Sequence, residues 1–196
     1  MLREAEAFTD RVQVDIMDGR FVPSRSIAAE DLARVKTSLS LEVHLMVSEP
    51  ETQIKVFLRA GASRVVFHRE AAPAPSRTIA LARRLGLEVG LAFNPETRCE
   101  DSKQLLGEVD FVLLLSVDPG FYGSPFLPSV LEKAQALRRV FPREIGMDGG
   151  IKVENIRQVK EAGVDYACVG SRIFRAPDPA AAYRELRDLA RDEEGL

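Results

Sequence analysis

Short apolar runs alternate with longer amphipathic stretches along the chain. Seven of these runs, each about four to seven residues long, have the length and composition of buried strands. They lie at residues 12–15, 41–47, 64–68, 88–93, 111–117, 144–147 and 166–169. The stretches between them have helical spacing, and a first helix is expected near residues 2–8. Strict alternation of strands and helices predicts a parallel sheet covered by helices.

Helix boundaries are marked by capping residues and glycines. Ser48 with Glu51, and Thr97 with Glu100, have the S/T-x-x-E spacing of a capping box at a helix start. Asp178 is expected to cap a last helix that runs toward residue 191. The glycines expected to end helices in the left-handed conformation are Gly61, Gly86 and Gly163.

The chain lacks linkers and low-complexity tracts, so residues 1–196 are expected to form one domain. Seven strand–helix units after an N-terminal helix are compatible with two arrangements of the sheet. The sheet could be open and doubly wound, or it could close into a (β/α)₈ barrel. Seven strands are one short of that barrel, and counting the units does not decide between the two.

Polar side chains stand at the carboxyl ends of the predicted strands, where parallel α/β folds collect functional residues. They are Asp15, His44, His68, Asn94, Ser116 and Asp148, followed by Gly170 and Ser171. Period-two alternation puts Gln13, Asp15 and Met17 on one face of a strand. It puts His44 and Met46 on one face of another. Such a set can hold a divalent metal or act as a general acid–base pair. The alternative is that these residues only cap strands and anchor loops.

Three glycine-bearing turns follow the last three predicted strands, at residues 119–123, 148–150 and 170–171. Glycine lets backbone N–H groups approach an anion closely. The corresponding loops of many barrels hold a phosphate group. Any one of these turns could be a tight turn only, but three at the same end of consecutive strands favour a phosphate site.

Composition narrows the class of protein. The chain has 27 Lys and Arg against 30 Asp and Glu, a net charge of −3, and no basic stripe, which argues against a nucleic-acid partner. It has no apolar run of about 18 residues to span a membrane, and its first ten residues do not resemble a secretory signal. Cys99 and Cys168 are expected to be reduced thiols. We therefore expect a cytoplasmic globular protein.

Seven segments, in this order and spacing, resemble the ribulose-phosphate 3-epimerase family. They are VDIMDGRFVPS (14–24), LEVHLMVSEPE (41–51), VVFHREA (65–71), GLAFNPET (90–97), LSVDPGFYGSPF (115–126), MDGGI (147–151) and VGSRIF (169–174). The resemblance implies a (β/α)₈ TIM-type phosphate-binding barrel, here lacking its first strand. It also implies metal-dependent interconversion of D-ribulose 5-phosphate and D-xylulose 5-phosphate, or of a closely related ketose phosphate, and assembly into a homo-oligomer.

The resemblance also implies roles for individual residues. Asp15 would be the proton acceptor and Asp148 the proton donor, for one direction of the reaction. A divalent Zn, Fe, Mn or Co ion would be held by Asp15, His44 and Asp148, with Gln13 at the remaining ligand position. Met17 and Met46 would line the centre. The substrate and its phosphate would contact His44, Gly120, Phe121, Tyr122, Gly123, Gly149, Gly150, Gly170 and Ser171.

The chain departs from the family pattern at four places. Gln13 stands where the family has a metal-binding His, and an amide oxygen is a weaker ligand than an imidazole nitrogen. The family's first strand, with a Ser near the substrate, has no counterpart. Leu115 replaces a central Met, and Tyr122 replaces a Gly of the phosphate loop.

These departures keep a second hypothesis open, a non-catalytic or impaired phosphosugar-binding paralogue. A different barrel reaction, decarboxylation or aldol chemistry, usually needs a Lys among the strand-end acids, and Lys152 is the nearest to Asp148. Three further residues are expected to have structural roles: His68 as a hydrogen-bonded strand end, Glu70 as a supporting acid, and Asp18 as a loop anchor.

Overall fold

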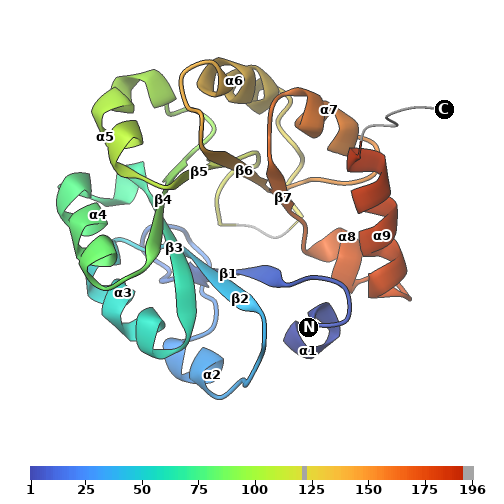
Figure 1. The fold of residues 1–196 in the computed structure, drawn as a ribbon, viewed down its shortest axis with the longest axis horizontal. Coiled ribbons are helices and arrows are strands. Elements are labelled where there is room, and N and C mark those ends of the chain that lie inside the picture. Colours follow the sequence, from blue (N-terminus) through green and yellow to red (C-terminus); the bar gives the residue numbers. More distant parts are fainter. Residues whose placement is uncertain (121–122, 192–196) are drawn as a thin grey trace.

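Seven parallel strands form one curved sheet that wraps into a barrel in the computed structural model, which describes residues 1–120 and 123–191 (Figure 1). The strands follow one another around the sheet in sequence order. They are β1 (Arg11–Met17), β2 (Ser40–Met46), β3 (Ala62–His68), β4 (Glu88–Phe93), β5 (Phe111–Leu115), β6 (Glu144–Asp148) and β7 (Tyr166–Cys168). The predicted strand–helix alternation is therefore confirmed, and the sheet curls into a barrel instead of remaining open.

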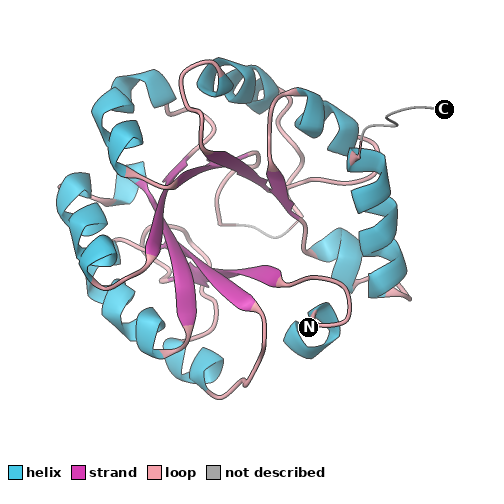
Figure 2. Ribbon diagram, viewed as in Figure 1, coloured by secondary structure: helices cyan, strands magenta, loops and turns pink. Residues whose placement is uncertain are grey.

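Helices surround the barrel on the outside (Figure 2). They are α1 (Leu2–Ala5), α2 (Ala29–Ala33), α3 (Pro50–Arg59), α4 (Pro75–Arg84), α5 (Lys103–Glu108), α6 (Ser129–Arg138), α7 (Ile156–Glu161), α8 (Ser171–Phe174) and α9 (Pro179–Ala190), with short 3₁₀ turns at Arg69–Ala71 and Cys99–Ser102. Within the described part of the chain, no helix is long and apolar enough to cross a membrane.

The main hydrophobic core lies between the sheet and the helices. Phe57 of α3, Ile79 of α4 and Leu137 of α6 are buried in the same cluster as the strand residues Val43 and Leu91. A smaller cluster fills the barrel interior with Val66, Ala92, Phe111 and Leu113. Successive residues of a strand therefore point alternately to the helices and to the barrel axis, as period-two patterning requires.

Two glycines inside the barrel make room for aromatic rings. A Cβ atom at Gly90 would overlap the ring of Phe111, and one at Gly146 would overlap the ring of Tyr166. Each ring fills the space that its neighbouring strand leaves free, and this keeps the narrow interior packed.

A partly buried charged cluster closes the amino-terminal end of the barrel. The guanidinium of Arg64 lies 3.0 Å from Glu42 and 2.5 Å from Glu144, and Arg11 lies 3.0 Å from Glu144. Tyr166 donates its hydroxyl hydrogen to Glu42 at 3.0 Å. This cluster fills the barrel interior at the amino-terminal ends of the strands.

The sheet has a seam between its first and last strands. β1 and β7 are the two ends of the described strand order and do not pair with each other. A cavity of about 450 Å³ lies along this seam and is lined by Gln13 of β1, Cys168 of β7 and Tyr183 of α9, among other residues. The seam is where an eighth strand of a complete barrel would lie.

Glycines end three helices as predicted, but both predicted capping boxes are wrong. Gly61, Gly86 and Gly163 have φ values of +99°, +79° and +88°. The side chain of Asp178 accepts a hydrogen bond from the backbone of Ala181 and caps α9. Ser48 instead donates its hydroxyl hydrogen to Asp18, so α3 begins after Glu49 without a side-chain cap. Likewise, no side-chain cap begins the 3₁₀ turn that follows Thr97.

Candidate functional site

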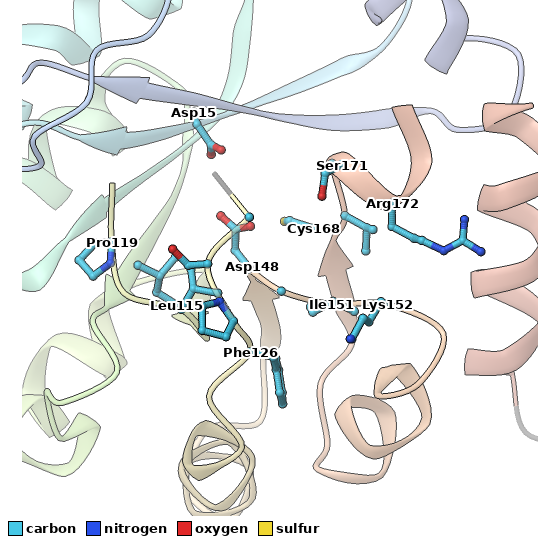
Figure 3. Close-up of a pocket in the computed structure, with 18 of the residues that line it drawn as sticks. Asp15, Leu115, Pro119, Phe126, Asp148, Ile151, Lys152, Cys168, Ser171 and Arg172 are labelled. Carbon is cyan, nitrogen blue, oxygen red and sulfur yellow. The ribbon is translucent and has the colours of Figure 1, made fainter. Parts of the chain in front are cut away.

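Two carboxylates and an imidazole meet at the carboxyl end of the barrel. Asp15, His44 and Asp148 come from β1, β2 and β6, and one potential ligand atom from each lies within 4.8 Å of the others. Nδ1 of His44 is 3.2 Å from Asp15 and 3.4 Å from Asp148. His44 is fully buried, whereas the side chains of Asp15 and Asp148 are 29% and 16% exposed. Figure 3 shows both carboxylates pointing into the same space.

Gln13 lies within this cluster and turns its amide nitrogen toward the carboxylates. Nε2 donates to Asp148 at 2.8 Å and to Asp15 at 3.0 Å. The amide oxygen accepts a hydrogen bond from the thiol of Cys168 at 3.0 Å. That bond crosses the seam between β1 and β7, and it fixes which end of the amide faces the acids.

The closeness of these groups shifts the pKa values of His44 and Asp148. Burial alone would lower the pKa of His44, but hydrogen bonds and charges from Asp148 and Asp15 raise it to about 9. Burial and the negative charge of Asp15 raise the pKa of Asp148 above the ordinary value, although bonds from His44 and Gln13 partly oppose this. Asp148 therefore holds a proton more readily than an ordinary solvent-exposed aspartate does.

The donor set fits a divalent transition metal. Carboxylate oxygens and an imidazole nitrogen are ligands for Zn, Mn, Fe and Co. Asp15, His44 and Asp148 lie close enough to share one ion. The oxygen of Gln13 could join them only if the amide turned over, because the nitrogen now faces the carboxylates.

A pocket of about 480 Å³ is lined by both aspartates (Figure 3). Met17, Met46 and Leu115 line it together with Asp15 and Asp148. The pocket is also lined by the residues that the family resemblance implies for the phosphate site, namely Gly120, Gly123, Gly149, Gly150, Gly170 and Ser171. Phe121 and Tyr122 lie outside the described residues.

The turn after β6 needs glycine. Gly149 and Gly150 have φ values of +110° and +65°. A Cβ atom at Gly150 would lie 2.8 Å from the backbone of Phe126, and one at Gly149 would clash with the side chain of Val117. These residues let the chain bend tightly beside the pocket.

The sequence reasoning missed several residues of the pocket. Lys152, Arg172 and Arg175 also line it, and of these Arg172 pairs with Glu185 of α9 at 2.7 Å. Their positions after β6 and β7 place them near the glycine turns, and this proximity in sequence could have predicted that they line the pocket. Cys168 was interpreted only as a reduced thiol, but it lines both the pocket and the seam.

A chain of polar groups continues behind His44. Nε2 of His44 is 2.9 Å from Nε2 of the fully buried His68, and Nδ1 of His68 is 3.4 Å from Glu70. Burial lowers the pKa of His68. Burial alone would raise the pKa of Glu70, but hydrogen bonds from His68, Thr97 and the Asn94 backbone hold it at about 2.

Asp18 anchors the loop after β1, as predicted. Its carboxylate accepts hydrogen bonds from the backbone of Arg20 and Phe21 and from both the backbone and the hydroxyl of Ser48. Although burial opposes the shift, these bonds lower the pKa of Asp18 to about 2.

Comparison with known proteins identifies relatives of this chain. The profile of the Ribulose-phosphate 3 epimerase family matches residues 2–174. A ribulose-phosphate 3-epimerase from Synechocystis sp. is 40% identical, over 97% of this chain and 87% of that protein. The enzyme of the same name from Bacillus subtilis is 36% identical, over 91% of this chain and 86% of that protein.

The solved structure of 3-hexulose-6-phosphate synthase from Salmonella typhimurium has the same fold. It superposes with a TM-score of 0.73 and 17% sequence identity, covering 96% of this chain and 90% of that one. The fold follows from this structural likeness. From the family match and the curated relatives it follows that this chain belongs to the ribulose-phosphate 3-epimerase family, a family of isomerases.

Proposed function

We propose that this protein is a metal-dependent 3-epimerase that interconverts D-ribulose 5-phosphate and D-xylulose 5-phosphate, or a closely related ketose phosphate. The observation that carries the proposal is the meeting of Asp15, His44 and Asp148 beneath a pocket walled by glycine turns. Membership of the family supports the same reaction.

The reaction needs two groups that exchange protons with one carbon atom. The C3 proton of the sugar is acidic because C3 adjoins a ketone, and its removal gives an enediolate. Return of a proton from the opposite face inverts C3. Asp15 accepts the proton in one direction, and Asp148, with its raised pKa, donates the other.

Asp15, His44 and Asp148 would hold the metal, which supplies positive charge that stabilises the enediolate oxygens. Without the ion, the buried imidazole of His44 lies with Nδ1 within 3.4 Å of both carboxylates, and its proton offsets their mutual repulsion. Met17 and Met46, which line the pocket, would present apolar side chains that exclude water from the reacting carbon.

The phosphate would occupy the glycine-lined wall. Backbone N–H groups of Gly149, Gly150 and Gly170 can donate to phosphate oxygens, and the hydroxyl of Ser171 adds a further donor. Lys152 and Arg175, which also line the pocket, would attract the anion. A volume of about 480 Å³ is within the usual range for small-molecule sites.

A second candidate is a phosphosugar-binding protein without turnover. The orientation of Gln13 favours it, because an amide nitrogen between the carboxylates competes with a metal ion. The open seam favours it as well, because Asp15 and Asp148 line the seam cavity in addition to the pocket.

Turnover separates the two candidates. Purified protein, stripped of metal and then titrated with Zn²⁺, Mn²⁺, Fe²⁺ or Co²⁺, should convert D-ribulose 5-phosphate to D-xylulose 5-phosphate in proportion to bound metal. A protein that binds one metal ion and the sugar phosphate, yet forms no xylulose 5-phosphate, would be the binding paralogue. A six-carbon ketose phosphate assayed in parallel would identify the preferred sugar.

A further inference from the structure

A second imidazole lies directly behind His44, on the opposite side from the two aspartates. His68 ends β3 and has no exposed surface. The two Nε2 atoms are 2.9 Å apart, and the rings meet end to end with centroids 5.0 Å apart and planes inclined by 23°. The ring of Phe21 also packs against His68. This N···N distance is that of a hydrogen bond with one shared proton.

The position of that proton follows from the other end of His44. Nδ1 of His44 faces Asp15 and Asp148, so it must offer a lone pair if it is to bind a metal ion there. A neutral imidazole with a free Nδ1 carries its proton on Nε2, and an imidazolium carries a proton on both nitrogens, so Nε2 is protonated in either state. Nε2 of His44 therefore donates to His68, which accepts on Nε2.

Glu70 fixes the second ring in turn. Since His68 accepts on Nε2, its own proton is on Nδ1, which faces the carboxylate of Glu70 at 3.4 Å in a long contact whose geometry falls short of a hydrogen bond. An ionised carboxylate can only accept hydrogen bonds. The other oxygen of Glu70 accepts from the backbone of Asn94 at 2.9 Å, and this holds the carboxylate in place.

We propose that His68 and Glu70 are positioning residues that fix the tautomer and ring plane of His44 and so set the metal affinity of the site. This inference rests on the metal site of the proposed function. A histidine that binds a metal commonly donates its other N–H to a partner, and loss of that partner typically costs about 10–100-fold in metal affinity or activity. Here the partner is a second histidine, which a carboxylate orients.

Variants at position 68 test the proposal through metal binding alone. His68→Leu removes the acceptor and should weaken Zn²⁺ binding, measured by calorimetry, by about 10–100-fold. His68→Gln keeps an acceptor for His44 and a donor for Glu70, so its affinity should stay within about threefold of wild type. The visible spectrum of bound Co²⁺ should change in the Leu variant and be retained in the Gln variant.

A second pair of variants does not alter either ring. Glu70→Gln leaves one amide oxygen where His68, Thr97 and the backbone of Asn94 all present donors, so Zn²⁺ affinity should fall by at least about fivefold. Glu96→Gln removes the same charge from an exposed residue near the end of β4 and should leave the affinity unchanged. The proposal is overturned if His68→Leu binds Zn²⁺ within twofold of wild type with the same Co²⁺ spectrum. It is equally overturned if Glu70→Gln and Glu96→Gln have the same affinity.

A measurement without metal separates this inference from the proposed function. In the metal-free chain, NMR should detect a scalar coupling across the N–H···N bond between Nε2 of His44 and Nε2 of His68. Absence of that coupling contradicts the proposed hydrogen bond between His44 and His68. A wild-type chain that shows the coupling but binds no divalent metal contradicts the proposed function, and it also overturns the part of this proposal that concerns metal affinity.

Discussion

Gln13 gives the acidic cluster an amide where the family resemblance implies an imidazole. The amide nitrogen hydrogen-bonds both aspartates, and its oxygen is held by the thiol of Cys168. Metal ligation by this oxygen would require the amide to turn over and give up all three bonds. Residue 13 therefore stabilises the pair of carboxylates in the absence of metal, and it competes with metal when one binds.

Gln13→His should tighten Zn²⁺ binding by at least about tenfold, because an imidazole nitrogen binds Zn²⁺ more strongly than an amide oxygen and the competing N–H donor is removed. Calorimetric titration of metal-free protein measures the change. Unchanged affinity would mean that residue 13 is not a ligand in this protein.

At the scale of single elements, the turn between β6 and α7 depends on glycine backbone geometry. Gly150→Ala should raise KM for the sugar phosphate by at least about tenfold, with a smaller effect on kcat, because a Cβ atom there meets the backbone of Phe126 and forces the turn open. Steady-state kinetics with Gly86→Ala provides the control, since Gly86 has a similar φ of +79° with nothing within 4 Å of a Cβ. Equal KM values for the two variants would contradict a phosphate role for the turn.

The loop after β1 is held by one carboxylate, and its contribution should depend on pH. The pKa of Asp18 is lowered from 3.8 to about 2, so its stabilisation is present above pH 3.8 and is lost as the pH falls through 2. Asp18→Asn should lower the free energy of unfolding at pH 7 by about 1–2 kcal/mol, allowing for solvent screening. Urea denaturation should show this difference shrinking toward acid pH, and a difference independent of pH would be inconsistent with the anchor.

Local sequence patterns predicted which helices and strands form better than they predicted where each one begins and ends. Alternation placed Asp15 with Met17, and His44 with Met46, on the faces that turn out to line the barrel. Ser48 was predicted to cap a helix, but a stronger acceptor far away in sequence, Asp18, binds its hydroxyl hydrogen. Whether Ser48 caps the helix or bonds a distant acceptor is decided by tertiary contacts, and the S-x-x-E spacing carries no information about those contacts.

At the scale of the whole molecule, the meeting of Asp15 with Asp148 could be predicted from parallel topology, because all strands end at the same side. The bonds from Cys168 to Gln13 and from His68 to His44 could not. They depend on how far the sheet curls and how strands are staggered, and these quantities do not appear in a list of strand sequences.

The seam should make the two end strands the least stable part of the sheet. β7 has three residues and one paired neighbour, whereas β4 is paired on both sides. Backbone amides of β7 should exchange with solvent deuterium at least about tenfold faster than those of β4, because opening β7 breaks fewer contacts. Comparable protection of both strands, measured by NMR on this chain, would mean that the seam is closed in solution.

The central claim is that Asp15 and Asp148 act on opposite faces of one carbon, and deuterium incorporation at C3 tests it most directly. In D₂O with saturating metal, Asp148→Asn should not interconvert the two epimers. It should still exchange the C3 proton of the one epimer whose C3–H bond points toward Asp15. Asp15→Asn should exchange only the other epimer. If both variants exchange the same epimer, or if either one still epimerises at the wild-type rate, the two residues do not divide the reaction between them.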